Sequence, residues 1–172
     1  DDSIFNETKY DYSILSSRIR ELAFLNKGIK LTITDERDKD DEGNFITDTY
    51  FSEKGLIDFI DYLDETREKL MDEPIAIEGE KNDMPIEIAM QYNSSFSENL
   101  HSYVNNINTH EGGTHLSGFR RGLTRTLKNY AEKSGMTSKL KFDISGDDFR
   151  EGLTAVISVK VAEPQFEGQT KT

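Results

Sequence analysis

The feature that most constrains the fold is a run rich in β-branched residues near the C-terminal end, at residues 153–161. Its apolar residues recur at every second position: Ala155, Ile157, Val159 and Val161. This period is typical of a β-strand. The alternate positions include the polar residues Thr154, Ser158 and Lys160. The pattern therefore predicts a strand with one covered and one partly solvated face, and Pro164 ends it because proline has no N–H to donate.

The rest of the chain combines further strands with single amphipathic helices. Apolar stripes with helical spacing predict helices at residues 12–26, 56–70 and 114–131, the first capped by Asp11. Strands are expected at residues 29–34, 45–51, 75–78, 85–92 and 100–107, with a short extended segment at 142–144 and a turn or short helix at 146–150. Strands interrupted by single helices favour an α+β fold.

Length and composition suit one soluble, globular domain. The chain has 172 residues, of which 34% are hydrophobic and 31% charged. It has no cysteine, which excludes disulfides and thiolate chemistry. No run approaches the roughly 18 apolar residues of a membrane span, and the acidic start is unlike a signal peptide. We expect a cytoplasmic location without a membrane partner. Because the sequence lacks an initiator Met, we also expect a segment cut from a longer protein.

The net charge of −12 is unevenly distributed. Residues 35–83 contain 18 acidic and 6 basic residues, and the remainder contains 15 of each. The acidic stretch is interpreted as a solvated face. A free-standing DNA-binding domain is expected to be basic, so this class is excluded.

The predicted helix at residues 114–131 has two contrasting faces. Its apolar face carries Leu116, Phe119, Leu123, Leu127 and Tyr130. The opposite face carries Arg121, Arg125 and Lys128, spaced four and three residues apart. This basic face is the candidate surface for DNA phosphates. A solvated helix face explains the same pattern equally well.

The sequence from His110 to His115 resembles a metal motif only superficially. The two histidines are five residues apart, whereas a helical zinc-protease motif requires a spacing of four, and Gly112 and Gly113 would break the helix. We expect no metal site here. The expected structure is a Gly-rich turn that leads into the next helix with Thr114 or a neighbour as its cap, and its backbone N–H groups could also form an anion nest. The sequence has no nucleophile elbow, P-loop or dinucleotide motif.

After the last strand, three hydrogen-bond donors follow Gly168. These are Gln169, Thr170 and Lys171. An ammonium beside an amide and a hydroxyl suits an anionic oxygen. Taken alone, the pattern is more common in solvated loops.

Four segments resemble one family, in the order that the family has them. Residues 162–172, 18–28, 103–115 and 150–153 are similar to the transducer domain of the DNA gyrase B family, a group of type IIA topoisomerases. Together they extend over nearly the whole chain. The equivalent domain in the B protein of topoisomerase IV is the close alternative. A mismatch-repair MutL domain and a free-standing interaction module with the same fold are two further alternatives.

The resemblance implies a fold, a role and partners. The implied fold is α+β, of the ribosomal-protein-S-five-like domain two type, with a mixed sheet, helices packed on one face and a single transducer domain at residues 1–172. Gln169, Thr170 and Lys171 would bind ATP, with Lys171 and Gln169 on its γ-phosphate. The role is to couple ATP binding and hydrolysis to DNA strand passage and negative supercoiling.

The same resemblance implies what surrounds the segment. Its partners would be the ATPase domain of the same chain, the gyrase A protein in an A2B2 heterotetramer, and duplex DNA. The magnesium-binding DNA-cleavage domain would follow it. The whole enzyme would be an ATP-dependent type II DNA topoisomerase, an isomerase that uses magnesium. The isolated segment is expected to be inactive and to hold no cofactor.

Overall fold

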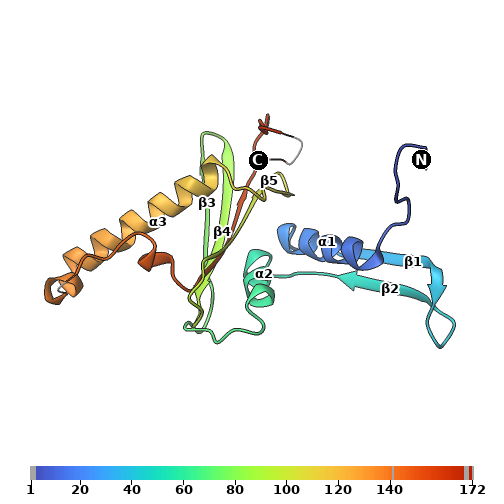
Figure 1. Cartoon of the computed structure of the whole chain (residues 1–172), viewed down its shortest axis with the longest axis horizontal. Helices are drawn as coiled ribbons and strands as arrows, with labels where there is room; N and C mark the ends of the chain where they lie inside the picture. Colours follow the sequence, from blue (N-terminus) through green and yellow to red (C-terminus); the bar gives the residue numbers. More distant parts are fainter. Residues whose placement is uncertain (1–2, 141, 169–170, 172) are drawn as a thin grey trace. The chain divides into compact units, whose positions relative to one another are not determined.

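A computed structural model describes residues 3–140, 142–168 and 171 (Figure 1). The chain divides into two compact units, Asp1–Asp58 and Phe59–Thr172. Each unit contains its own sheet, with two strands in the first unit and five in the second.

In the first unit, a helix packs on a β-hairpin. The elements are α1 (Tyr12–Leu25), β1 (Leu31–Lys39) and β2 (Phe45–Tyr50). The predicted cap is confirmed, since the Ile14 N–H donates to Asp11 Oδ1 at 3.1 Å. Polar contacts join the helix to the hairpin: Asp48 Oδ2 accepts hydrogen bonds from the hydroxyls of Tyr12, at 3.0 Å, and Ser16, at 2.8 Å. The bonds from Ser16 and Tyr12 lower the pKa of Asp48.

The second unit is built on a mixed sheet. Its strands are β3 (Ile75–Lys81), β4 (Met84–Tyr92), β5 (Asn99–Val104), β6 (Ile107–Asn108) and β7 (Leu153–Val159). They are arranged in the order β3-β4-β7-β5-β6. β7 is antiparallel to β4 and parallel to β5. The last strand in sequence is therefore the central strand of the sheet (Figure 1).

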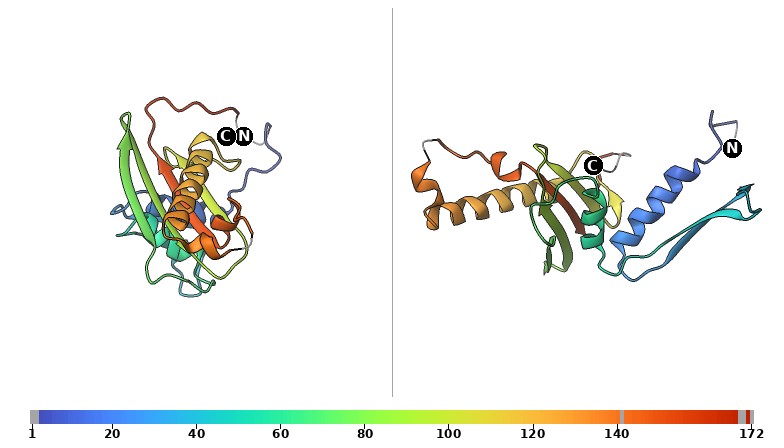
Figure 2. Two further views of the ribbon diagram at one scale, coloured as in Figure 1. Left: turned by 90° about the vertical axis from the view of Figure 1, so that its left-hand side faces the viewer. Right: turned by 90° about the horizontal axis from the view of Figure 1, so that it is seen from below.

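Helices cover both faces of this sheet, which corrects the expectation that they pack on one face. On one face, Leu116 of α3 (Thr114–Lys133) joins a buried cluster with strand residues that include Met90 and Ile157. On the other face lies the part of α2 (Leu56–Leu63) that belongs to this unit. Its Phe59 ring lies 6.1 Å from the ring of Tyr103. Figure 2 shows α2 and α3 on opposite sides of the sheet.

The predicted partly wet face of residues 153–161 is wrong for the strand itself. β7 is buried along its whole length, with Thr154 0% and Ser158 3% exposed. The physical reason is its central position: strands flank it on both sides, and the faces of the sheet are covered. An isolated sequence pattern cannot distinguish a polar side chain in solvent from one with a buried partner.

The buried partner of Thr154 is Asp64, which directly follows α2. Asp64 is 0% exposed and accepts four hydrogen bonds. The donors are Thr154 Oγ1 at 2.7 Å, Arg67 Nη1 at 2.9 Å, Gln91 Nε2 at 2.9 Å and Asn93 Nδ2 at 3.0 Å. The network joins the end of α2 to β4, β7 and the residue after β4.

Several element ends differ from the predictions. α2 stops at Leu63 rather than residue 70, because the following residues bond to the end of β4: the Leu70 N–H donates to the Tyr92 carbonyl at 2.9 Å. The predicted strand at 100–107 splits into β5 and β6 at a turn. Residues 142–144 form no strand, whereas a short 3-10 helix at Asp148–Arg150 confirms the prediction there.

The predicted apolar face of α3 is correct except at Tyr130. Leu116 is buried, and Phe119 and Leu123 pack against the same cluster. Tyr130 is 62% exposed. The reason is that the distal end of α3 extends past the edge of the sheet, as Figure 1 shows.

Candidate functional site

The first candidate site is the tail that follows β7. Val161 and Phe166 pack against the core cluster, so the tail returns to the body of the unit after leaving the sheet. Farther along, the Lys171 N–H donates to the Gly168 carbonyl at 3.1 Å. Lys171 Nζ lies 5.4 Å from the centroid of the Phe166 ring, within the range of a cation–π contact.

The neighbours of Lys171 leave its charge available. Within the described part of the chain, its ammonium has an aromatic ring and no carboxylate as its neighbour. Its backbone has φ +62°, in the left-handed region. Gln169 and Thr170, the other predicted phosphate contacts, lie outside the described residues. The structure therefore describes one of the three predicted contacts, the cationic one.

The Gly-rich turn before α3 has the predicted form, and the cap is a neighbour of Thr114, Gly113. Gly112 and Gly113 have φ of +91° and +155°, and the helix begins at Thr114. Gly113 provides no side chain, so the cap position makes no side-chain hydrogen bond to the helix. A Cβ on Gly113 would lie 2.9 Å from the imidazole of His115, which explains the glycine here.

His115 faces a hydroxyl rather than a metal site. Its Nε2 lies 3.4 Å from Thr109 Oγ1, which in turn bonds to Ser102 Oγ at 2.6 Å. Burial lowers the pKa of His115, which favours its neutral form. Among the described residues, no group of three His, Cys, Asp or Glu side chains is placed to hold a metal ion.

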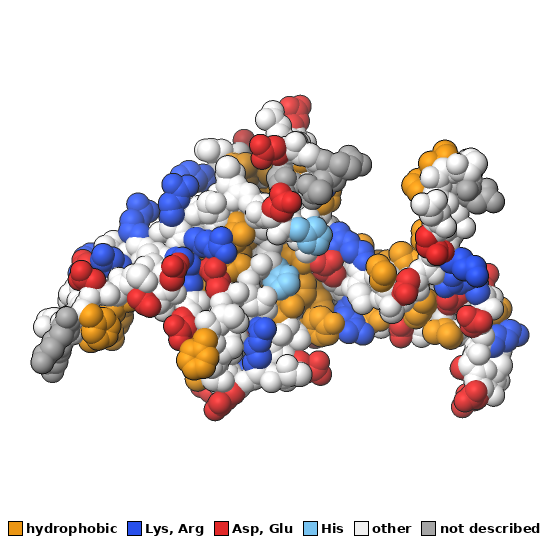
Figure 3. Space-filling view, in the orientation of Figure 1, with side chains coloured by type: hydrophobic (Ala, Val, Ile, Leu, Met, Phe, Trp, Pro, Cys, Tyr) orange, Lys and Arg blue, Asp and Glu red, His pale blue; other side chains and the backbone are white. Residues whose placement is uncertain are grey.

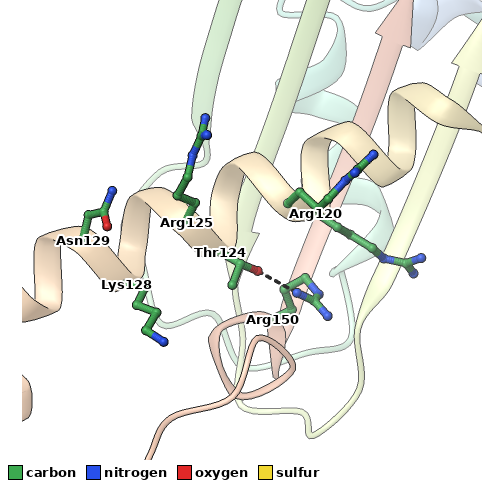
Figure 4. A pocket seen from close by; sticks show the side chains of 7 residues that line it. Arg120, Thr124, Arg125, Lys128, Asn129 and Arg150 are labelled. Carbon is green, nitrogen blue, oxygen red and sulfur yellow. Dashed lines mark hydrogen bonds between the residues drawn. The ribbon is translucent and has the colours of Figure 1, made fainter.

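The second candidate site is the basic face of α3. Arg121, Arg125 and Lys128 are all exposed. Together with four neighbours they line a cavity of about 320 Å³; the neighbours are Arg120, Thr124, Asn129 and Arg150. Figure 3 shows Lys and Arg side chains along this helix, and Figure 4 shows Arg125 and Lys128 extending away from it.

A carboxylate missed by sequence reasoning organises one end of this cavity. Glu98 accepts hydrogen bonds from Arg120 at 3.1 and 2.8 Å, and its Oε1 lies 2.9 Å from Arg150 Nε. Arg150 also donates to Thr124 Oγ1 at 2.7 Å, drawn in Figure 4. Two of the cavity's arginines are thus paired with Glu98. The charges of Arg121, Arg125 and Lys128 have no carboxylate partner in the described part of the chain, so they are the ones open to an external anion.

No sequence signal could have identified Glu98. It is 22 residues from Arg120, in an acidic chain where carboxylates are frequent. Only the fold brings it to α3.

Comparison with known proteins identifies the family. A family model described as DNA gyrase B matches residues 55–172. The chain belongs to the DNA gyrase B family. The DNA gyrase B subunit of Eisenibacter elegans is 62% identical over 172 residues, which cover 100% of this chain and 36% of that relative. The chain thus spans about a third of the length of such gyrase B relatives.

Solved structures of this group have the same fold. The 43K ATPase domain of Thermus thermophilus gyrase B, in complex with an aminocoumarin, has a TM-score of 0.82 and 33% identity. The match covers 98% of this chain and 44% of that chain. The topoisomerase IV ATP-binding domain of Francisella tularensis, in complex with a small-molecule inhibitor, has a TM-score of 0.75 and 28% identity, covering 99% of this chain and 44% of that one.

The gyrase B family match agrees with the α+β architecture described above. It begins at residue 55, close to the start of the second unit at Phe59. In the described ranges, no helix combines the length and apolar character needed to cross a bilayer.

Proposed function

We propose that this chain is a transducer segment of a gyrase B protein, with the transducer role carried by its second unit. In this role it couples ATP binding and hydrolysis to DNA strand passage and negative supercoiling. The observation that carries the proposal is the cationic group of Lys171 on a tail that continues from the central strand of the sheet.

Lys171 is the proposed contact to the terminal phosphate of ATP. An ammonium with no carboxylate neighbour in the described residues can form a charge-assisted hydrogen bond to a phosphate oxygen. Gln169 and Thr170 are proposed as neutral donors beside it. ATP itself would be held mainly by the ATPase domain of the same chain.

Coupling follows from the position of the tail. The tail begins at β7, which pairs with both β4 and β5. A contact made by Lys171 is therefore connected to the central strand of the sheet. If that contact is present only with ATP bound, its loss after hydrolysis shifts the balance between two arrangements of this unit and the ATPase domain.

The basic face of α3 is proposed to meet duplex DNA. Arg121, Arg125 and Lys128 are exposed and available to phosphates. The proposed partner of the whole gyrase B protein is the gyrase A protein, in an A2B2 assembly. Magnesium would be bound by the DNA-cleavage domain that follows this segment in the gyrase B chain. The names of the relatives support this proposal, and the chain covers about a third of their length.

The test is Lys171→Ala in the full-length protein assembled with gyrase A. Loss of a charge-assisted bond contributing about 1.5–3 kcal/mol should lower ATP turnover by at least ~10-fold and abolish most supercoiling. Gln169→Ala should cost less, because a neutral amide makes a weaker bond. Lys81→Ala, at an exposed position in β3, is the matched control.

Two results would count against this proposal. Wild-type turnover and supercoiling in the Lys171 variant would remove its role at the phosphate. A melting curve that collapses in the same variant would make the residue structural instead.

A further inference from the structure

A single asparagine holds the root of the tail. Asn105 Nδ2 donates to the Val161 carbonyl at 2.8 Å, and Asn105 Oδ1 accepts from the Val161 N–H, also at 2.8 Å. The backbone N–H of Asn105 donates to the Val159 carbonyl at 3.0 Å. One residue therefore binds the last residue of β7 and the first part of the tail.

The geometry explains why a side chain is needed here. β5 runs parallel to β7 as far as Val104, which pairs with Val159. At Asn105 and Asn106 the backbone adopts φ of +50° and +64° and turns into β6. Beyond this turn the backbone of β5 cannot continue its hydrogen bonding to β7. The side-chain amide of Asn105 has the donor and acceptor of a peptide group and occupies that place instead.

The other side of the tail root is held by the sheet. The Lys160 N–H donates to the Pro85 carbonyl of β4 at 3.0 Å. At Val161 the bonding to β4 has ended, and in the described ranges it is Asn105 that supplies the partners of both the Val161 N–H and the Val161 carbonyl. Removing the Asn105 amide would break both hydrogen bonds at Val161, so the tail would no longer be held at Val161.

The tail has a second anchor between this root and Lys171. Phe166 packs against the core cluster, and its ring lies under Lys171 Nζ at 5.4 Å. The path of the tail is therefore fixed at Val161 by hydrogen bonds and at Phe166 by apolar contact. Lys171 follows Val161 by ten positions and Phe166 by five, so both anchors lie between the sheet and its ammonium.

We propose that Asn105 is a positioning residue for Lys171. It does not touch the nucleotide. Its side chain fixes where the tail leaves the sheet and so increases the fraction of molecules in which Lys171 reaches the phosphate. This inference rests on the proposed role of Lys171.

The principal variant is Asn105→Gly in the full-length protein assembled with gyrase A. Glycine retains the left-handed backbone at no steric cost while removing the amide. The control is Asn82→Gly. Asn82 and Asp83 form the matching two-residue turn between β3 and β4, with φ of +52° and +60°, and the described residues include no hydrogen bond from the Asn82 side chain to the tail.

ATP turnover of Asn105→Gly should fall about fivefold. This is the factor expected when one hydrogen bond of average net strength no longer stabilises the arrangement in which the tail is held at Val161. Asn82→Gly should match the wild type. In a Lys171→Ala background, Asn105→Gly should cause no further loss, because the residue acts only through Lys171. Asn105→Asp retains the acceptor for the Val161 N–H and lacks the donor, so it should be intermediate.

Amide hydrogen exchange at Val161 provides a readout that is independent of activity. Protection of this N–H should be lost in Asn105→Gly and retained in Asn82→Gly. The inference is overturned by wild-type turnover in Asn105→Gly, by an equal loss with and without Lys171, or by unchanged protection of Val161. If Lys171→Ala has wild-type turnover, the proposed phosphate contact itself fails. If Lys171→Ala loses turnover but Asn105→Gly does not, the proposed phosphate contact of Lys171 is supported and the positioning role of Asn105 fails.

Discussion

The hydroxyl of Thr154 donates to the carboxylate of Asp64 at 2.7 Å, across 90 residues of sequence. Both side chains are 0% exposed. The bond joins the middle of the sheet to the segment after α2, and Arg67, Gln91 and Asn93 complete the donors around the same carboxylate.

Replacing Asp64 with Ala should destabilise the second unit by about 3 kcal/mol or more. The change removes the shared acceptor of four buried or partly buried donors, although Arg67 and Asn93 also donate to Thr154 Oγ1, at 3.2 and 3.0 Å. Asp61→Ala is the matched control: the Asp61 side chain is 43% exposed in an ion pair with Lys69, so its removal should cost less than about 1 kcal/mol. Urea unfolding of both variants checks the difference. Equal losses of unfolding free energy in the two variants would mean that the buried network of Asp64 stabilises the unit no more than the exposed ion pair does.

Asp64 also predicts a dependence of stability on pH. Burial raises its pKa, but hydrogen bonds from Gln91, Thr154, Asn93 and Arg67 outweigh burial and hold the pKa below the ordinary 3.8. Folding therefore favours the ionised form. Its contribution is complete above the pKa of the unfolded chain and disappears as the pH falls through the lower pKa of the folded chain. The difference in unfolding free energy between wild type and Asp64→Asn should thus begin to shrink as the pH falls below about 4. A difference that is constant with pH would contradict this.

The partners of Asp64 could not be predicted from the sequence. The helix in which α2 lies was predicted from its apolar stripe, and the cap of α1 was predicted from Asp11. Both depend on residues a few positions apart. Nothing near Asp64 in the sequence indicates that it bonds to Thr154. The sequence pattern instead predicted that the face of β7 carrying Thr154 is partly solvated. Long-range partners of polar residues depend on topology, which periodicity does not contain.

Gly152→Ala should destabilise the second unit by more than about 2 kcal/mol. Gly152 has φ +72° just before β7, and a Cβ there would lie 2.4 Å from the Asn93 carbonyl oxygen. Gly79→Ala is the control, since a Cβ there meets nothing within 4 Å and φ is ordinary. A thermal melt of each variant is the measurement. Comparable melting temperatures would show that the backbone at Gly152 shifts without cost.

The basic face of α3 can be tested in the full-length enzyme by changing Arg121, Arg125 and Lys128 together to Ala. If each contacts one phosphate, the slope of log K against log salt should fall by about 0.9 per contact. ATPase activity without DNA should be largely unchanged. A control triple change at the exposed residues Lys30, Lys54 and Lys81 holds net charge equal while sparing α3. If both triple variants lose the same slope, the effect is one of net charge and the face has no specific role.

The candidate sites were predictable to different degrees. The helical spacing of Arg121, Arg125 and Lys128 sufficed to put them on one exposed surface. Lys171 was identified from the residues beside it together with the family resemblance. The roles of Glu98 and Asn105 could not be predicted, because their partners, Arg150 and Val161, come from distant segments. Sequence patterns indicated which groups are available but not what holds them in place.

The central position of β7 has a consequence for synthesis on the ribosome. β3 with β4, and β5 with β6, can form as two separate hairpin-like pieces while the chain emerges. Neither can join the other until residues 153–159 have left the exit tunnel, because β7 alone pairs with both pieces. Until then the inner edges of β4 and β5 are unpaired. A translational pause shortly before Leu153 should therefore be the moment at which the nascent unit is most dependent on chaperones.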